Sequence, residues 1–323
     1  MAAQPEIAVV VPSHDRPLRL RWLLNALAEQ TLARERFEVV VGHDSSGIDT
    51  EELLRGHPLA REGVLRHVTL APGSAPPGRN RNAALREVRA PLVAFTDDDC
   101  RPPREWLERC LAAAARHPGA IVQGSTRPDP EEQTVLEHAP WVLTRTIQPP
   151  RPWAQACNIV YPREVVEACG GFPEDMYVGE DTALAERARE RGVDYAGAPE
   201  VETWHAVEEA SLPGMLRASW RWQGLPLLIK RHPRLRQEFP LWAFWRREHV
   251  WLPFAAAGWA LVRRSRLAGL LAVPYLVHAA PKHSSFPRGR LRSVAELPGR
   301  VAIDTAEFVA LAWGSIRHRT PFL

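Results

Sequence analysis

Residues 92–99 read Leu-Val-Ala-Phe-Thr-Asp-Asp-Asp, an apolar run that ends in three consecutive aspartates. The apolar part is too short for an ordinary helix and is typical of a buried strand in a parallel sheet. Adjacent carboxylates repel one another and cost stability unless a divalent cation or hydrogen-bond donors compensate. Ligands of open α/β sheets bind at the carboxyl ends of strands. The stretch therefore predicts a cation-dependent ligand site at a sheet edge. The alternative is an acidic turn that leads into a helix.

The residues before this stretch alternate between short apolar runs and amphipathic segments. Such an alternation predicts an α/β fold with a mainly parallel sheet flanked by helices. The expected strands are 7–11, 37–41 and 64–70, and the expected helices are 18–30, 50–55, with Thr50 as its cap, and 80–88.

The residues after the aspartates are less regular. Helices are expected at 105–115, 163–169 and 181–191, and a strand at 120–124. A proline-rich stretch, 126–152, predicts loops over the sheet edge. Substrate contacts are expected from residues 125–160, including Trp141, Trp153 and Asn158.

Cysteine usage and the start of the chain bear on the cellular compartment. The four cysteines have no CxxC spacing, which favours a reducing environment. Residues 1–6 lead directly into the first expected strand and lack the succession of basic, apolar and small residues that marks a signal peptide. A cytoplasmic protein is therefore expected.

Charge divides the chain into two parts. Residues 1–210 hold 23 Lys and Arg against 33 Asp and Glu, a net charge of −10, whereas residues 211–323 hold 18 against 5, a net charge of +13. The basic part also has seven of the twelve tryptophans. Basic residues with tryptophan suit an anionic membrane surface or a nucleic acid.

Two apolar stretches lie within the basic part, at 251–262 and 267–278, with three arginines between them. Each is shorter than the roughly 20 residues that span a bilayer. They predict helices in the membrane interface or a shallow hairpin, peripheral on the inner face of the cell membrane; a helical hairpin packed on the catalytic domain is the alternative. We expect a catalytic domain at 1–225 and a basic, Trp-rich helical region at 226–323.

Several motifs follow one another along residues 7–225. They are Val9 to Arg16, Asp44-Ser45-Ser46, Arg79-Asn80, the DXD-type run Asp97-Asp98-Asp99, Gly170-Gly171-Phe172 and Gly179-Glu180-Asp181. In this order they resemble the motifs of the inverting family 2 glycosyltransferases, which have the GT-A fold. The chain departs from the family pattern at His43-Asp44, where two acidic residues are usual, and at Ser45, where glycine is usual.

The resemblance implies a nucleotide-diphosphate sugar as donor and Mg²⁺ or Mn²⁺ as cofactor. Asp99 is implied as the direct metal ligand, with Asp97 and His205 as further candidates, and a structural role is the alternative for His205. Asp97 and Asp98 are also implied in contacts to ribose, sugar or metal-bound water. The remaining implied donor-site residues are Pro12, His14, Arg16, Asp44 and Arg79. Of these, Asp44 is implied to contact the nucleotide base. The alternatives are a turn residue for Asp44 and support of a helix start for Arg79.

The resemblance also implies a catalytic base. In an inverting transfer the acceptor hydroxyl must lose its proton as it attacks the sugar. Asp181 is implied as that base, with Glu180 orienting the acceptor. The alternative is an acidic pair placed by the dipole of the following helix.

These observations predict a metal-dependent inverting glycosyltransferase, with a lipid-linked or cell-envelope glycan as acceptor. A soluble transferase that acts on a small molecule or natural product is the closest rival. A sugar-phosphate nucleotidyltransferase is disfavoured because residues 12–17 contain no glycine. A nucleic-acid-binding protein is disfavoured by the acidic first two thirds and the lack of a zinc or RNA-recognition motif.

Overall fold

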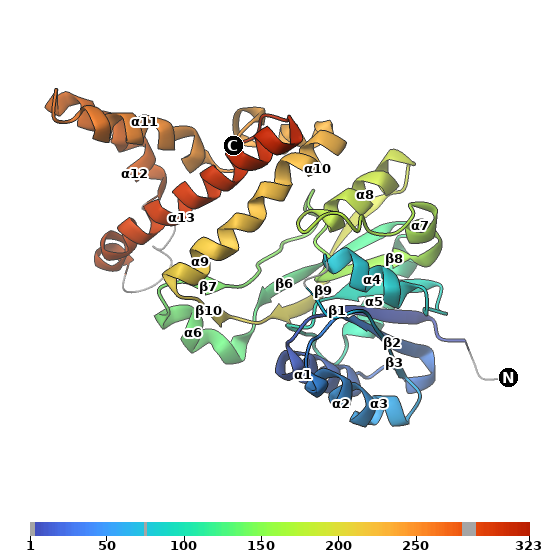
Figure 1. The fold of residues 1–323 in the computed structure, drawn as a ribbon. Coiled ribbons are helices and arrows are strands. Elements are labelled where there is room, and N and C mark those ends of the chain that lie inside the picture. Colours follow the sequence, from blue (N-terminus) through green and yellow to red (C-terminus); the bar gives the residue numbers. More distant parts are fainter. Residues whose placement is uncertain (1–3, 74–75, 280–288) are drawn as a thin grey trace. The chain divides into compact units, whose positions relative to one another are not determined.

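The computed structural model of the chain describes residues 4–73, 76–279 and 289–323. It divides into two compact units, one of residues 1–136 and 143–208 and the other of residues 137–142 and 209–323. The first unit is built around a sheet and the second is helical (Figure 1). The domain boundary expected at residue 225 stays a prediction.

The sheet of the first unit is mixed and mainly parallel. Strands β1, β2, β3 and β4 are parallel to one another, β8 is antiparallel to β4 and β6, and β6 is parallel to β9. The predicted fold class is confirmed. The strand order is β3 (Leu65–Thr69), β2 (Phe37–His43), β1 (Ile7–Ser13), β4 (Leu92–Thr96), β8 (Asn158–Pro162), β6 (Ile121–Pro128), β9 (Tyr195–His205) and β5 (Cys100–Arg101).

The strand order reverses between β1 and β4. From β1 the chain passes to β2 and then β3 on one side, and it returns to place β4 on the other side of β1. In open α/β sheets such a reversal leaves a crevice outside the carboxyl ends of the two strands, where ligands bind. Asp97 directly follows β4, so the aspartates lie at this crevice.

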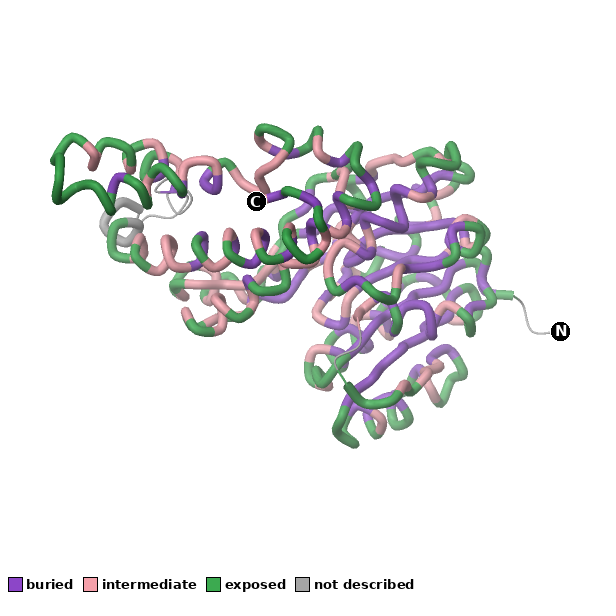
Figure 2. The backbone as a smooth tube through the Cα atoms, turned by 45° about the horizontal axis from the view of Figure 1, so that its top comes forward, coloured by how far each residue is buried: buried purple, intermediate pink, exposed green. Residues whose placement is uncertain are grey.

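Helices cover both faces of the sheet, because successive strand residues point to opposite sides. Ile7, Val9 and Val11 pack in one cluster with the helices on one face, and Ala8 and Val10 pack in a second cluster on the other. The inner strands β1, β2 and β8 are accordingly buried along their whole length (Figure 2), whereas β3 and β9 are only partly buried. The first face carries α1 (Pro17–Ala28), α2 (Ile48–Gly56), α3 (Pro58–Arg61) and α5 (Trp106–Arg116), and the second carries α4 (Pro77–Leu85), α7 (Arg163–Ala168) and α8 (Glu180–Glu190).

Two details of the sequence prediction are wrong. Helix α2 begins at Ile48 after Gly47, so Thr50 is buried inside the helix and is not its cap. Strand β8 was not foreseen, because its five residues follow a proline-rich loop with no alternation of polar and apolar side chains. Pairing with β4 and β6 on both sides determines this strand.

The second unit holds a buried polar network as well as apolar contacts. Tyr275 donates to Asp304 at 3.0 Å, Arg300 pairs with Asp304 at 2.8 Å, and Arg246 pairs with Glu307 at 3.2 Å. Its helices are α9 (Leu212–Ser219), α10 (Leu225–Arg231), α11 (Arg247–Leu261), α12 (Val273–Ala279) and α13 (Gly289–His318), with 3₁₀ turns η3 (Trp220–Gly224), η4 (Pro233–Glu238), η5 (Pro240–Trp242) and η6 (Arg266–Ala272). The first unit also contains η1 (Arg34–Arg36) and η2 (Pro130–Glu132), and the chain passes from one unit to the other within α6 (Gln133–His138) and within the paired strands β7 (Val142–Leu143) and β10 (Glu208–Glu209).

The two predicted apolar stretches form a helical hairpin of α11 against η6 and α12. Gly258 lies so close to the backbone of Ala268 that a Cβ there would come within 2.7 Å of its carbonyl oxygen. Within the described residues, no helix has both the length and the apolar character needed to cross a bilayer.

Candidate active site

The loops after β1 and β4 are joined by hydrogen bonds and ion pairs. Ser13 donates to Oδ2 of the buried Asp98 at 2.7 Å, and Arg16 donates to Oδ2 of Asp99 at 2.7 Å. Burial and the neighbouring Asp99 raise the pKa of Asp98 to about 7. Arg16 also lies 3.5 Å from Glu208. The predicted donor-site residues of the two strands thus meet, and Pro12 is buried within β1 at the same end.

His205 faces Asp99 because β5 and β9 pair antiparallel, with Cys100 opposite His205. Nε2 of His205 lies 3.5 Å from Oδ1 of Asp99. Nδ1 of His205 lies 2.9 Å from the carbonyl oxygen of Ala206, to which it donates its proton. A histidine held in this way keeps the lone pair of Nε2 for a cation, as metal-ligating histidines do.

Asp99 and His205 fit a divalent cation. Nε2 of His205 and Oδ1 of Asp99 are separated by a distance typical of two ligands of one ion. The third candidate ligand, Asp97, instead accepts a hydrogen bond from Arg81 at 2.7 Å. Mg²⁺ and Mn²⁺ are commonly held by one or two carboxylates and completed by water and substrate phosphate. Such an ion would neutralise the charge that develops on a departing diphosphate.

Asp44 lies wholly buried at the end of β2 and is held by residues from two other elements. Asn80 of α4 donates to its Oδ1 at 2.8 Å, and Nδ1 of His14 lies 3.1 Å from the same oxygen. Asp15 accepts hydrogen bonds from the backbone and the hydroxyl of Ser46, which ties the loop after β1 to the loop after β2. The predicted residues His14 and Asp44 are therefore in contact, whereas the side chain of Arg16 binds Asp99.

Arg81 is the site residue that sequence reasoning missed. Its side chain is 5% exposed and donates to Asp97 at 2.7 Å and to Glu180 at 2.8 Å. It also lies over the ring of Phe172, 5.3 Å from the centroid. The predicted Arg79 is exposed. It lies two positions before Arg81 in the same helix, and this spacing turns its side chain about 200° around the helix axis, away from the side that faces the site. The Arg-Asn-Arg-Asn run at 79–82 was the available signal, but it does not say which arginine points inward.

The predicted acidic pair begins helix α8. Gly179 has a left-handed backbone with φ of 79°, and the helix follows it directly. Oδ1 of Asp181 accepts from the backbone of Thr182 at 2.7 Å, and Oδ2 accepts from the backbone of Ala156 at 3.3 Å. Two backbone donors thus hold the carboxylate in one orientation.

The electrostatic surroundings of Asp181 suit a proton acceptor. Burial and the adjacent Glu180 raise the pKa of Asp181 to about 7, although Arg81 opposes the shift. A base is most effective when its pKa lies near the working pH.

Asn158 does not fit the expected acceptor contact. It is buried in β8, donates to the carbonyl oxygens of Ser125 and Val201 at 2.7 Å each, and accepts from Trp106 at 3.0 Å. Its side-chain amide therefore links β8 to β6, β9 and α5. The fold explains this residue without a ligand.

Comparison with known proteins identifies the family. The model of glycosyl transferase family 2 matches residues 8–172, half of the chain. The chain belongs to glycosyl transferase family 2. The predicted family, and with it the class of enzyme, is confirmed.

Two relatives and one solved structure illustrate the match. Glycosyltransferase AglE of Haloferax volcanii is 24% identical over 205 residues, covering 62% of this chain and 67% of the relative. Validoxylamine A glucosyltransferase of Streptomyces hygroscopicus subsp. jinggangensis is 27% identical over 285 residues, covering 74% of this chain and 64% of the relative. The chain thus spans about two thirds of the length of these relatives.

The mannosyltransferase PcManGT from Pyrobaculum calidifontis, solved with GDP-Man and Mn²⁺, superposes with a TM-score of 0.60 at 21% identity, covering 98% of this chain and 87% of that one. At this level of identity, the likeness shows a shared GT-A fold. The shared fold thus extends beyond residues 8–172, which the family model matches.

Proposed function

We propose that this family 2 member is a metal-dependent inverting glycosyltransferase that moves a sugar from a nucleotide-diphosphate sugar to an acceptor hydroxyl. The observation that carries the proposal is the position of Arg81. This buried cation binds Asp97 of the aspartate run and Glu180, the neighbour of Asp181, at 2.7 and 2.8 Å. One side chain thereby couples the candidate donor carboxylates to the candidate base.

On the donor side, each residue has a role that its surroundings support. Asp44 receives the nucleotide base, with His14 beside it, and Asp97 and Asp98 contact the ribose and sugar. Pro12, Arg16 and the exposed Arg79 complete the pocket for base and phosphates; a guanidinium at the start of a helix suits a phosphate. Asp99 and His205 hold Mg²⁺ or Mn²⁺, with Asp97 as a further candidate. GDP-Man and Mn²⁺ in the mannosyltransferase structure support this class of donor and ion.

On the acceptor side, Asp181 takes the proton of the attacking hydroxyl. Its carboxylate is held by two backbone donors, and its pKa of about 7 leaves a large fraction ionised at neutral pH. Glu180 is held by Arg81 and keeps the start of α8 in place for the acceptor. Attack from the face opposite the leaving diphosphate inverts the anomeric carbon.

A thermal-shift screen tests the donor site. Nucleoside diphosphates and nucleotide-sugars are added singly to the full chain, with Mn²⁺, with Mg²⁺ or with a chelator. A ligand that binds the native state raises the melting temperature by mass action, by an amount that grows with concentration. We expect at least one nucleotide to raise the melting temperature only when Mn²⁺ or Mg²⁺ is present. If no nucleotide raises the melting temperature, the proposal is overturned.

The acceptor we favour is a lipid-linked or cell-envelope glycan. A small-molecule acceptor is the second candidate, favoured by 27% identity to validoxylamine A glucosyltransferase over 74% of this chain. Product analysis with the active donor separates the two. Transfer to a polyprenyl-linked sugar supports the first, and transfer only to soluble cyclitols or sugars supports the second.

The hairpin supports action at the inner face of a membrane. Trp259 is 83% exposed and Leu267 is 75% exposed. Arg263, Arg264 and Arg266 lie at the turn between them, which suits anionic headgroups. Exposed apolar side chains flanked by arginine are typical of an interfacial helix.

Vesicle flotation tests this association. The full chain should float with vesicles that contain anionic phosphatidylglycerol and much less with neutral phosphatidylcholine. Trp259→Ser combined with Leu267→Ser should lower the bound fraction by about tenfold or more, since each loses apolar burial. Trp313→Ser, at an exposed tryptophan of α13, is the matched control. If the double variant and Trp313→Ser bind the vesicles equally, the hairpin is not the membrane-binding element.

A further inference from the structure

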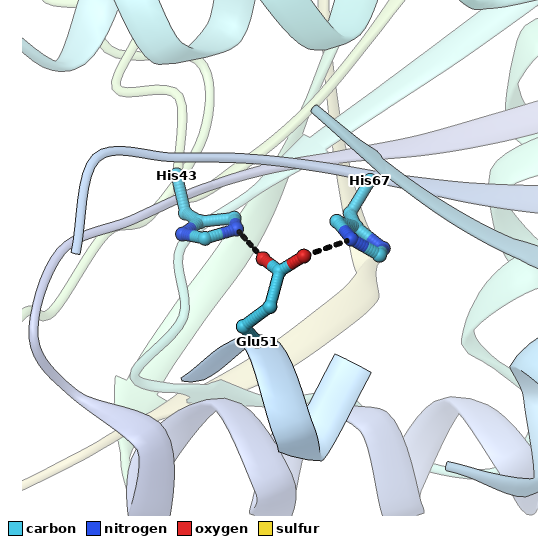
Figure 3. A group of neighbouring side chains, drawn as sticks. All are labelled: His43, Glu51 and His67. Atoms are coloured by element: carbon cyan, nitrogen blue, oxygen red, sulfur yellow. Dashed lines mark hydrogen bonds and ion pairs between the residues drawn. The ribbon is translucent and has the colours of Figure 1, made fainter. Parts of the chain in front are cut away.

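Two imidazoles and a carboxylate meet at the ends of β2 and β3, apart from the aspartate run (Figure 3). His43 is the last residue of β2, Glu51 lies in the first turn of α2, and His67 lies in β3. Nε2 of His43 is 3.0 Å from Oε2 of Glu51, and Nε2 of His67 is 3.2 Å from Oε1 of the same carboxylate. Glu51 therefore joins two histidines that are 24 positions apart in the chain.

The spacing of these atoms matches a set of metal ligands. One ligand atom from each of the three residues lies within 4.8 Å of the others. Zinc binds histidine nitrogen and carboxylate oxygen at about 2.0–2.1 Å, which places neighbouring ligand atoms of a tetrahedron roughly 3.3 Å apart. The distances of 3.0 and 3.2 Å run to the two different oxygens of Glu51, so the three ligand atoms, which lie within 4.8 Å of one another, draw closer together when the ion binds.

The cluster is anchored on one side and open to solvent on the other. The side chain of His43 is 2% exposed, whereas Glu51 is 20% exposed and His67 is 22% exposed. Thr69 donates to Oε2 of Glu51 at 3.1 Å, and so orients the carboxylate from β3. A bound ion would keep access to water, which is the usual fourth ligand of a site with three protein ligands.

We propose that His43, Glu51 and His67 form a second metal site, specific for a zinc-class ion. Two nitrogen ligands and one oxygen favour Zn²⁺, Co²⁺ or Ni²⁺ over Mg²⁺, whereas the oxygen-rich aspartate run favours Mg²⁺ or Mn²⁺. In the ion-free protein Nε2–H of His43 and Nε2–H of His67 donate to Glu51. When the ion binds at Nε2, each neutral ring carries its proton on Nδ1 instead. Binding ties together β2, α2 and β3, which Thr69 also links through its contacts with His43 at 3.2 Å and with Glu51 at 3.1 Å.

The test measures zinc directly and needs no substrate. The full chain is freed of metal by chelator dialysis, and Zn²⁺ is then titrated in equilibrium dialysis, with Co²⁺ in parallel for its visible absorption. We expect one equivalent bound at this cluster, an intense Co²⁺ spectrum typical of four-coordination, and a raised melting temperature. His67→Gln and Glu51→Gln should each weaken that equivalent by more than about tenfold.

Two control variants locate the bound ion. Asp99→Asn alters the aspartate run, so it weakens binding of any ion there but should leave the intense four-coordinate Co²⁺ band unchanged. His117→Gln, at the end of α5, removes a histidine from elsewhere in the same unit and should also leave it unchanged. Since His67 is partly exposed, its variant is expected to fold, which a melting curve checks. An unchanged spectrum in His67→Gln, or no bound Zn²⁺ in the wild type, overturns the proposal.

Discussion

Arg81 donates to Glu180 at 2.8 Å, although 99 positions separate the two residues in the chain. Their side chains are 5% and 8% exposed, so the ion pair is almost removed from water. The second hydrogen bond of Arg81, to Asp97, brings the aspartate run into the same network. A change at this one guanidinium should therefore affect both stability and the candidate site.

Arg81→Gln should destabilise the protein strongly. Removing one partner of a buried pair leaves the other charge uncompensated and costs about 3–5 kcal/mol. Arg79→Gln is the control, because Arg79 lies two residues away in the same helix and is exposed; its cost should stay within about 0.5 kcal/mol. Urea denaturation of both variants measures the free energy of unfolding, and equal values would contradict the structural role of Arg81.

Asp181→Asn and Asp99→Asn should have different effects. The first removes the proton acceptor, and kcat should fall by about 10²–10⁴-fold while the Kd of the donor stays nearly unchanged. The second removes a candidate metal ligand, so donor binding should lose its dependence on Mn²⁺. Donor titration with and without chelator, together with single-turnover rates, separates the two. If the variants behave alike, the proposed division of roles is wrong.

The rate should rise with pH as Asp181 ionises. Only the carboxylate can accept a proton, and burial beside Glu180 raises its pKa to about 7. We expect kcat/KM to increase about tenfold per pH unit below pH 6 and to level off above pH 8. A pH profile of the purified enzyme checks this. A rate independent of pH between 5 and 8 would exclude Asp181 as the base.

The same group should lower stability as pH rises. The ordinary pKa of an aspartate is 3.8, so between that value and about 7 the native state binds more protons at Asp181 than the unfolded state does. The free energy of unfolding then falls across this range because of this group. Asp181→Asn removes that contribution, and the variant should gain stability relative to wild type as pH rises from 5 to 8. Denaturation curves at both pH values measure the difference.

Gly171→Ala should cost more than the same change at Gly119. Both glycines have positive φ, of 72° and 77°, so alanine is strained by about 1–2 kcal/mol at either position. At Gly171 a Cβ would also lie 2.6 Å from Oδ1 of Asn82, which accepts the backbone proton of Phe172, whereas nothing lies within 4 Å at Gly119. The difference between the two melting temperatures isolates the clash, and equal losses would mean that Asn82 moves aside freely.

The sequence alone determined the family, the fold class and the order of the main elements. Whether a short segment is buried shows in its own composition, so the strands at 7–11, 37–41 and 92–96 could be assigned from their apolar residues. The run Asp97 to Asp99 was found because three carboxylates directly follow an apolar strand, whereas Asp44 and Asp181 were found through the resemblance to family 2 motifs.

Only the tertiary structure decided which side chains face one another. Strand pairing across β5 and β9 brought His205 to Asp99, and the rotation of α4 turned Arg81 inward and Arg79 outward. The meeting of His43, Glu51 and His67 depends in the same way on three elements converging at one edge of the sheet. Periodicity reports which face of an element is buried, but contacts between elements depend on the register and packing of residues far apart in the chain.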